Sequence, residues 1–264
     1  MDKDRMDELA GDPRFIPGIY NYCDRWCERC AFTFRCMNYA LAQEEETDAA
    51  ASRDLRNKAF WDRLDEVFET TRELIEEEAE EADFDLDEEE LQESMREQQE
   101  VHEAAQAQPY SRTARAYIDV VDQWFKLNEG LGGDEGDERK SQAQASSPAG
   151  EPVENTPGLH DCLEVICWYQ PQIWVKLCRA ASGTIRAASE EIECFQEDAD
   201  GSAKVAILGI ERSMAAWASL RHRFPDHEDA ILALGTLKRL LRQVEAAFPN
   251  ARAFLRPGFD TDGT

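Results

Sequence analysis

The chain has 264 residues, and its 29 basic and 56 acidic side chains give a formal net charge of −27. This charge argues against nucleic acid and anionic lipid as partners, because Lys and Arg normally neutralise their phosphates. With 42% hydrophobic and 32% charged residues, the chain is expected to fold. We find no apolar run of 18 residues and no apolar signal segment, and therefore expect a cytoplasmic protein with reduced thiols and no membrane span.

The charge is unevenly distributed along the chain. Residues 159–264 carry 12 basic and 15 acidic side chains, whereas residues 44–103 carry 6 basic and 25 acidic ones. Residues 130–157 are rich in Gly, Ser and Pro and offer almost nothing to bury, which predicts a flexible, disordered linker. We therefore expect four regions: a Cys-rich metal-binding segment (1–40), an acidic helical region (41–129), the linker (130–157) and a C-terminal helical bundle region (158–264).

Apolar side chains recur at helical spacing through most of the chain. In the first half this predicts helices over 53–82, over 86–108 and from Pro109 to about 125. The third of these has the strongest apolar stripe, made of Ala114, Tyr117, Ile118, Val121, Trp124 and Phe125. Strand patterns of period two are absent, so the predicted fold class is all-α, a helical bundle of six to seven main helices.

In the second half we expect helices over 159–181, over 184–195, over 203–223 and from 226 until Pro249. Pro171 should kink the first of them and Gly183 should end it. The stretch 198–202, Asp-Ala-Asp-Gly-Ser, resembles a turn that ends in a helix N-cap. The last helix carries a narrow stripe of Leu234, Leu237, Leu241, Val244 and Phe248.

Four of the eight cysteines lie within fourteen residues, with the spacing C-x3-C-x2-C-x5-C: Cys23, Cys27, Cys30 and Cys36. A helical turn would place Cys23 and Cys27 on one side, with Cys30 following and Cys36 returning as a fourth ligand. Flanking positive charge favours the thiolate that binds metal, and aromatic side chains would limit solvent access. The residues expected in these two roles are Arg25, Arg29 and Arg35 for charge, and Trp26, Phe32 and Phe34 for shielding.

Such a compact run of cysteines is typical of iron–sulfur ligation, whereas structural zinc more often uses two separated pairs. A 4Fe-4S cluster is therefore the leading prediction, with zinc as the alternative. A site without metal, holding a redox disulfide or buried thiols, also remains open. The first three cysteines have a spacing that resembles that of radical SAM enzymes over eight residues, but Arg29 precedes the third and no alternating strands and helices follow.

Three functions follow from these features. The first is a cluster protein for redox, sensing or assembly, with a basic or redox protein partner. The second is a non-catalytic interaction module stapled by zinc. The third is an enzyme whose site lies in the C-terminal bundle, and no catalytic residue can be assigned for it. Its polar candidates, which also suit the edge of a helical core, are Glu164, Tyr169, Lys176, Arg179, Lys204, Glu211 and Arg212.

The other four cysteines and the C-terminal tail have simpler interpretations. Cys162, Cys167 and Cys178 lie among apolar residues, and we expect them to be free thiols buried in a helical core, with a second metal site as the alternative. Cys194 lies further along the chain. The tail 254–260 carries two Phe around Arg256, Pro257 and Gly258. We expect it to fold back onto the bundle, with anchoring of a partner as the alternative.

Overall fold

A computed structural model describes residues 8–44, 88–128, 158–190, 193–225 and 228–260, together with residues 68, 69, 72 and 75. These residues form helices, turns and loops, with no strand among them, which confirms the all-α class. The predicted helix over 53–82 lies outside the described residues except for those four positions, which are helical. The predicted linker over 130–157 lies outside them entirely.

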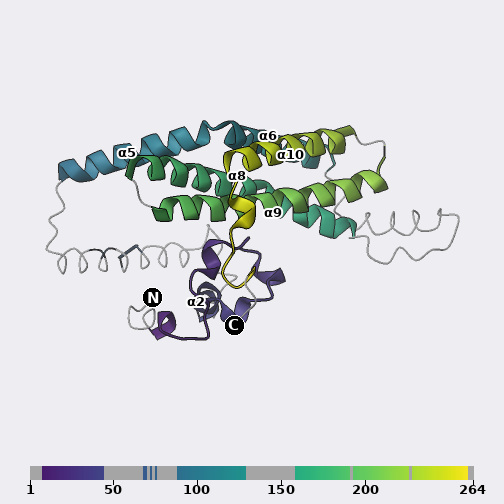
Figure 1. Ribbon diagram of the computed structural model, residues 1–264. Coiled ribbons are helices and arrows are strands. Elements are labelled where there is room, and N and C mark those ends of the chain that lie inside the picture. Colours follow the sequence, from purple (N-terminus) through teal and green to yellow (C-terminus); the bar gives the residue numbers. More distant parts are fainter. Residues whose placement is uncertain are drawn as a thin grey trace. The chain divides into compact units, whose positions relative to one another are not determined.

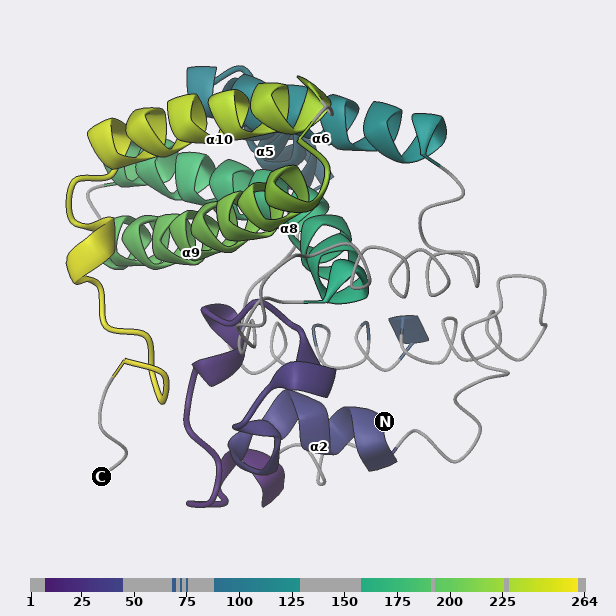
Figure 2. The same ribbon diagram turned by 90° about the vertical axis from the view of Figure 1, so that its right-hand side faces the viewer.

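The chain divides into two compact units, Met1–Glu100 with Leu255–Thr264, and Val101–Phe254. The second unit is built on four long helices: α6 (Pro109–Leu127), α8 (Leu159–Glu190), α9 (Glu193–Arg223) and α10 (Glu228–Ala247). Helix α8 packs against α6 and α9, and α10 packs against the same two helices. The contacts therefore close into a four-helix bundle, with α6 and α10 in one layer and α8 and α9 in the other (Figures 1 and 2).

Aromatic side chains hold the centre of this bundle. Trp217 of α9 and Tyr117 of α6 are fully buried, and the Trp217 Nε1–H donates to the Tyr117 hydroxyl at 3.0 Å. The Trp217 ring also meets the Trp124 ring edge-on, with centroids 5.3 Å apart. The stripe predicted for α6 is confirmed, because all its members are buried except the half-buried Phe125.

Helices α8 and α9 run through the breaks expected in their sequences. Pro171 and Gly183 both lie inside α8, so the expected end at Gly183 is wrong. The stretch 198–202 lies inside α9 and is not a turn. Its helical conformation buries Ala199 and Ser202 and places Asp198 in an ion pair with Arg179 of α8 at 2.5 Å. Packing between the two helices therefore overrides the local turn preference.

Gly183 is needed because α8 and α9 approach closely at this point. A Cβ atom there would lie 2.9 Å from the Phe195 carbonyl oxygen and 3.1 Å from the Ala199 Cβ. We expect Gly183→Ala to lower the free energy of unfolding by about 1–3 kcal/mol, because a backbone atom must move. Gly235→Ala is the matched control: a Cβ there meets nothing within 4 Å, so the helix should gain about 0.5–1 kcal/mol. Urea unfolding followed by circular dichroism measures both, and an equal gain in the two variants would contradict the close contact.

Helices α5 and α10 can be compared with the helices predicted from the sequence. Helix α5 (Glu88–Gln106) matches the helix predicted over 86–108, and its residues 89–100 are exposed, as its sparse apolar stripe predicts. Helix α10 ends before Pro249 as expected. Its buried stripe is Ala233, Leu237, Leu240 and Val244, whereas Leu234 and Leu241 are only half-buried.

In the first unit, the described segment 8–44 consists mostly of short turns and loops. Three 3-10 turns, η1 (Ile19–Asn21), η2 (Cys27–Arg29) and η3 (Thr33–Arg35), lead into α2 (Met37–Glu44). The Ile16 N–H donates to the Arg35 carbonyl at 3.0 Å, which joins the two ends of this segment. Ile19 is only 2% exposed and forms its small core. No helix in the described ranges of either unit is both long and apolar enough to cross a membrane.

Candidate metal centre

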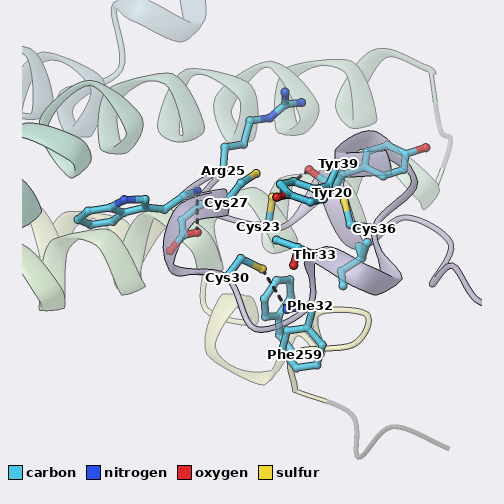
Figure 3. A pocket seen from close by; sticks show the side chains of 13 residues that line it. Tyr20, Cys23, Arg25, Cys27, Cys30, Phe32, Thr33, Cys36, Tyr39 and Phe259 are labelled. Atoms are coloured by element: carbon cyan, nitrogen blue, oxygen red, sulfur yellow. Dashed lines mark hydrogen bonds between the residues drawn. The ribbon is translucent and has the colours of Figure 1, made fainter. Parts of the chain in front are cut away.

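The four clustered cysteines line one pocket, which we call the cysteine pocket (Figure 3). Its enclosed volume is small, about 20 Å³, and the pocket is partly open to solvent. Cys27 is exposed, and the other three thiols are half-buried. The structure therefore brings the predicted site residues together around one space. As they stand, no three Cys, His, Asp or Glu side chains of the described residues are arranged to hold a single metal ion.

Short turns of backbone position these cysteines. Cys27 begins η2 and Cys30 closes it, with the Cys30 N–H donating to the Cys27 carbonyl at 3.1 Å. Cys36 closes η3 in the same way, donating to the Thr33 carbonyl at 3.2 Å. Both η2 and η3 thus end on a cysteine, and a 3-10 turn brings residues three apart close together.

The helical turn expected between Cys23 and Cys27 is absent, and a bend takes its place. Arg25 has a φ of 54°, in the left-handed region that non-glycine residues rarely adopt. The Asp24 carboxylate accepts a hydrogen bond from the Trp26 N–H at 3.3 Å. This local bond competes with helix formation, so the chain turns around the pocket here and does not continue as a helix.

Two of the sulfur atoms already have hydrogen-bond partners. The Phe32 N–H donates to the Cys30 Sγ at 3.4 Å, and the Cys23 thiol donates to the Tyr20 carbonyl at 3.5 Å. Hydrogen bonds to ligand sulfurs are one of the features that tune bound metal clusters. The pocket therefore offers Cys30 a fixed polar partner as well as neighbouring thiols.

The arginines do not play the expected electrostatic role at Cys27. Burial raises the pKa of the Cys27 thiol, and the nearby Cys23, Cys36 and Cys30 raise it further. The guanidinium of Arg25 points away from the cysteines (Figure 3). Without a bound cation, the pocket therefore favours the neutral thiol at Cys27.

The other two arginines are occupied elsewhere. Arg29 stacks on the Trp26 ring, with 4.3 Å between its guanidinium carbon and the ring centroid. The Arg35 Nε–H donates to the Arg14 carbonyl at 3.4 Å. Both side chains therefore stabilise the loops around the pocket.

The walls of the pocket are more aromatic than the sequence analysis predicts. Trp26 and Phe32 line it as expected, but Phe34 is 72% exposed and does not. Three further aromatic side chains complete the lining: Tyr20, Tyr39 and Phe259. Tyr20 and Tyr39 lie close to the cysteines in sequence, so their place could have been inferred. Phe259 comes from the C-terminal tail, which joins the first unit and corrects our expectation that the tail packs on the bundle.

The cysteines of the bundle lie apart from the cysteine pocket. Cys162 and Cys178 are buried, as expected, and burial raises the pKa of both. Cys167 is exposed, so the expectation of a buried thiol is wrong there. Cys194 is exposed as well. All four are free thiols.

The polar side chains of the bundle form contacts spread along α9. Asp198 pairs with Arg179, and Glu211 pairs with Arg252 at 2.8 Å. Thirteen residues of helix separate the two contacts, which is about 20 Å. Arg212 donates to the Tyr169 hydroxyl from the same helix. These three contacts therefore tie α9 to neighbouring segments at separate points.

No protein-family model, curated protein or solved structure matches this chain. The residues around the cysteine pocket are therefore the basis for a functional proposal.

Proposed function

We propose that this helical protein holds a 4Fe-4S cluster on Cys23, Cys27, Cys30 and Cys36, for electron transfer, redox sensing or cluster assembly. The observation that carries the proposal is the convergence of four thiols on one aromatic-walled pocket. Thiolates are the ligands of iron–sulfur clusters, and a compact run of cysteines is their usual source. A donor set of four thiols also suits zinc, so the choice between them depends on how the ligands are spaced along the chain.

The spacing of the cysteines favours a cluster over a single zinc ion. All four ligands come from one run of fourteen residues, which is typical of iron–sulfur ligation, whereas structural zinc more often uses two separated pairs of cysteines. Aromatic walls also limit solvent access, which is one determinant of a cluster's reduction potential.

The charges around the site indicate how binding would proceed. The raised pKa of Cys27 means that this ligand is protonated before metal arrives. A bound metal cation stabilises the thiolate of Cys27, so its proton is released when the metal binds. A redox protein would be the partner in electron transfer, and the net charge of −27 would favour a partner with a basic surface.

We expect Cys27→Ser to lower bound iron and sulfide at least about tenfold in protein purified without oxygen, because one of four ligands is lost. The matched control is Cys194→Ser, which removes an exposed thiol from α9 and should leave the iron content unchanged. Iron and acid-labile sulfide are measured per chain in both. Equal iron in the two variants would contradict the ligand assignment.

A zinc-bound chain would give a different result in the same experiment. Wild-type protein would then carry one zinc and no visible absorption, and Cys27→Ser would lose that zinc. This outcome would overturn the cluster and favour an interaction module with a structural zinc site.

A further inference from the structure

We propose that the C-terminal turn 256–260 is a structural part of the cysteine pocket, and that Phe259 is the wall that shields Cys30 and its bound group from solvent. This inference rests on the proposed function for the identity of the bound group. The placement of the wall itself rests only on contacts within the first unit.

The first observation is a contact that leads from the C-terminal turn to a ligand sulfur. Phe259 lines the cysteine pocket and meets Phe32 edge-on, with ring centroids 5.1 Å apart (Figure 3). Phe32 in turn donates its backbone N–H to the Cys30 Sγ. Phe259 therefore supports the residue that fixes one sulfur, and it covers one side of the same space.

The second observation is that the turn holds its own shape. Arg256 makes two side-chain hydrogen bonds to the Asp260 carboxylate, both at 2.9 Å, and its backbone N–H donates to the same carboxylate at 3.1 Å. The Asp260 N–H returns a bond to the Arg256 carbonyl at 3.1 Å. The guanidinium also lies over the Phe259 ring, 4.8 Å from its centroid. A bidentate pair with so little solvent exposure, 13% for the Arg256 side chain, fixes the ring in place.

The third observation is the close fit between the turn and the cysteine segment. Gly258 has a φ of 75°, and a Cβ there would lie 2.7 Å from the Ile16 Cδ1 and 3.0 Å from the Ile19 Cδ1. Ile19 also lines the cysteine pocket. A glycine is thus required both by the backbone conformation and by the contact. The turn is therefore packed into the segment that carries the cysteines.

Together these contacts give the C-terminal turn a role in solvent access. When the Phe259 wall is in place, the thiol of Cys30 and the atoms bound to it face an aromatic ring. When the wall is removed, water, oxygen and chelators reach them from this side. The rate at which the thiols react, or at which a bound cluster is lost, should then depend on residues at the far end of the chain.

The test uses the full chain with Phe259→Ala or Arg256→Ala. The matched control is Arg14→Ala, because Arg14 also pairs with an aspartate, Asp12, and stacks on a phenylalanine outside the pocket. In metal-free protein, alkylation of Cys30 is followed by mass spectrometry, with the exposed Cys194 as the internal reference. We expect Cys30 to be alkylated about two- to tenfold faster in both tail variants. This is the factor by which the loss of an edge-to-face ring contact shifts the equilibrium for local opening of the pocket. Cys194 should not change, nor should Cys30 in the control.

The same variants are then compared after purification without oxygen. In iron-loaded protein, loss of visible absorption under a chelator should accelerate by a similar factor in the tail variants only. Faster alkylation in a chain that binds no iron would support the wall and reject the proposed function. Unchanged alkylation of Cys30 in both tail variants, with circular dichroism like that of wild type, would overturn the wall whatever metal is bound. Equally faster alkylation of Cys30 in Arg14→Ala would also overturn the proposed wall, because the loss of any ion pair would then be enough to expose this thiol.

Discussion

Replacing Trp217 by alanine is expected to destabilise the four-helix bundle by about 3–5 kcal/mol, the usual cost of truncating a buried tryptophan. Trp217 is completely buried, and its ring contacts the Trp124 ring edge-on. The change therefore leaves a cavity between α6 and α9 that rigid helices cannot fill. It also removes the donor to the Tyr117 hydroxyl. Burial raises the pKa of Tyr117 to about 12, so this hydroxyl cannot compensate by ionising.

Trp217→Phe is the control that separates packing from hydrogen bonding. It keeps a ring against Trp124 but loses the indole N–H, so we expect a smaller loss of about 1–3 kcal/mol. Urea unfolding monitored by circular dichroism gives both values. A loss below about 1 kcal/mol for the alanine variant would contradict the placement of this residue at the centre of the bundle.

Metal binding to the cysteine pocket is expected to tighten steeply with pH. The pKa of Cys27 lies above its ordinary value of 9.0, so this thiol is protonated throughout the neutral range and must lose its proton when metal binds. Each proton released makes the apparent affinity rise about tenfold per pH unit. The stability of the metal-free protein has the opposite pH dependence. The raised pKa of Cys27 lowers the free energy of unfolding as the pH rises above 9.

Zinc is a suitable equilibrium probe for this effect, since it also takes four thiolates. Competition with a coloured chelator between pH 6 and pH 8 measures its affinity, and release of protons into a weak buffer counts the thiols that ionise. Affinity that falls as the pH decreases is the expected result. An affinity independent of pH over this range would mean that protonated thiols are not the ligands.

Part of the fold and of the candidate site can be predicted from the sequence. The α6 stripe from Ala114 to Trp124 has the helical period over several turns, so its buried face could be predicted without the structure. The four clustered cysteines could be assigned to one site from their spacing alone, because short loops close at little entropic cost. In both cases the signal is the spacing of residues that are close in sequence.

The remaining features depend on contacts between distant segments. Gly183 and the stretch 198–202 have the local chemistry of helix ends, yet the packing of α8 on α9 keeps both helical. Phe259 has no local signal that links it to Phe32. The direction of the Arg25 side chain follows from a backbone bend that spacing does not reveal. Tertiary packing decides the two helical stretches and the place of Phe259, and a local bend decides the direction of Arg25, so a single sequence did not predict them.

The most direct test of the central claim is the metal and sulfide content of wild-type protein purified without oxygen, with its visible spectrum. A 4Fe-4S cluster on the four cysteines of the pocket predicts about four iron and four sulfide per chain and absorption near ~400 nm. One zinc per chain without colour, or no metal with the four thiols freely reactive, would contradict it.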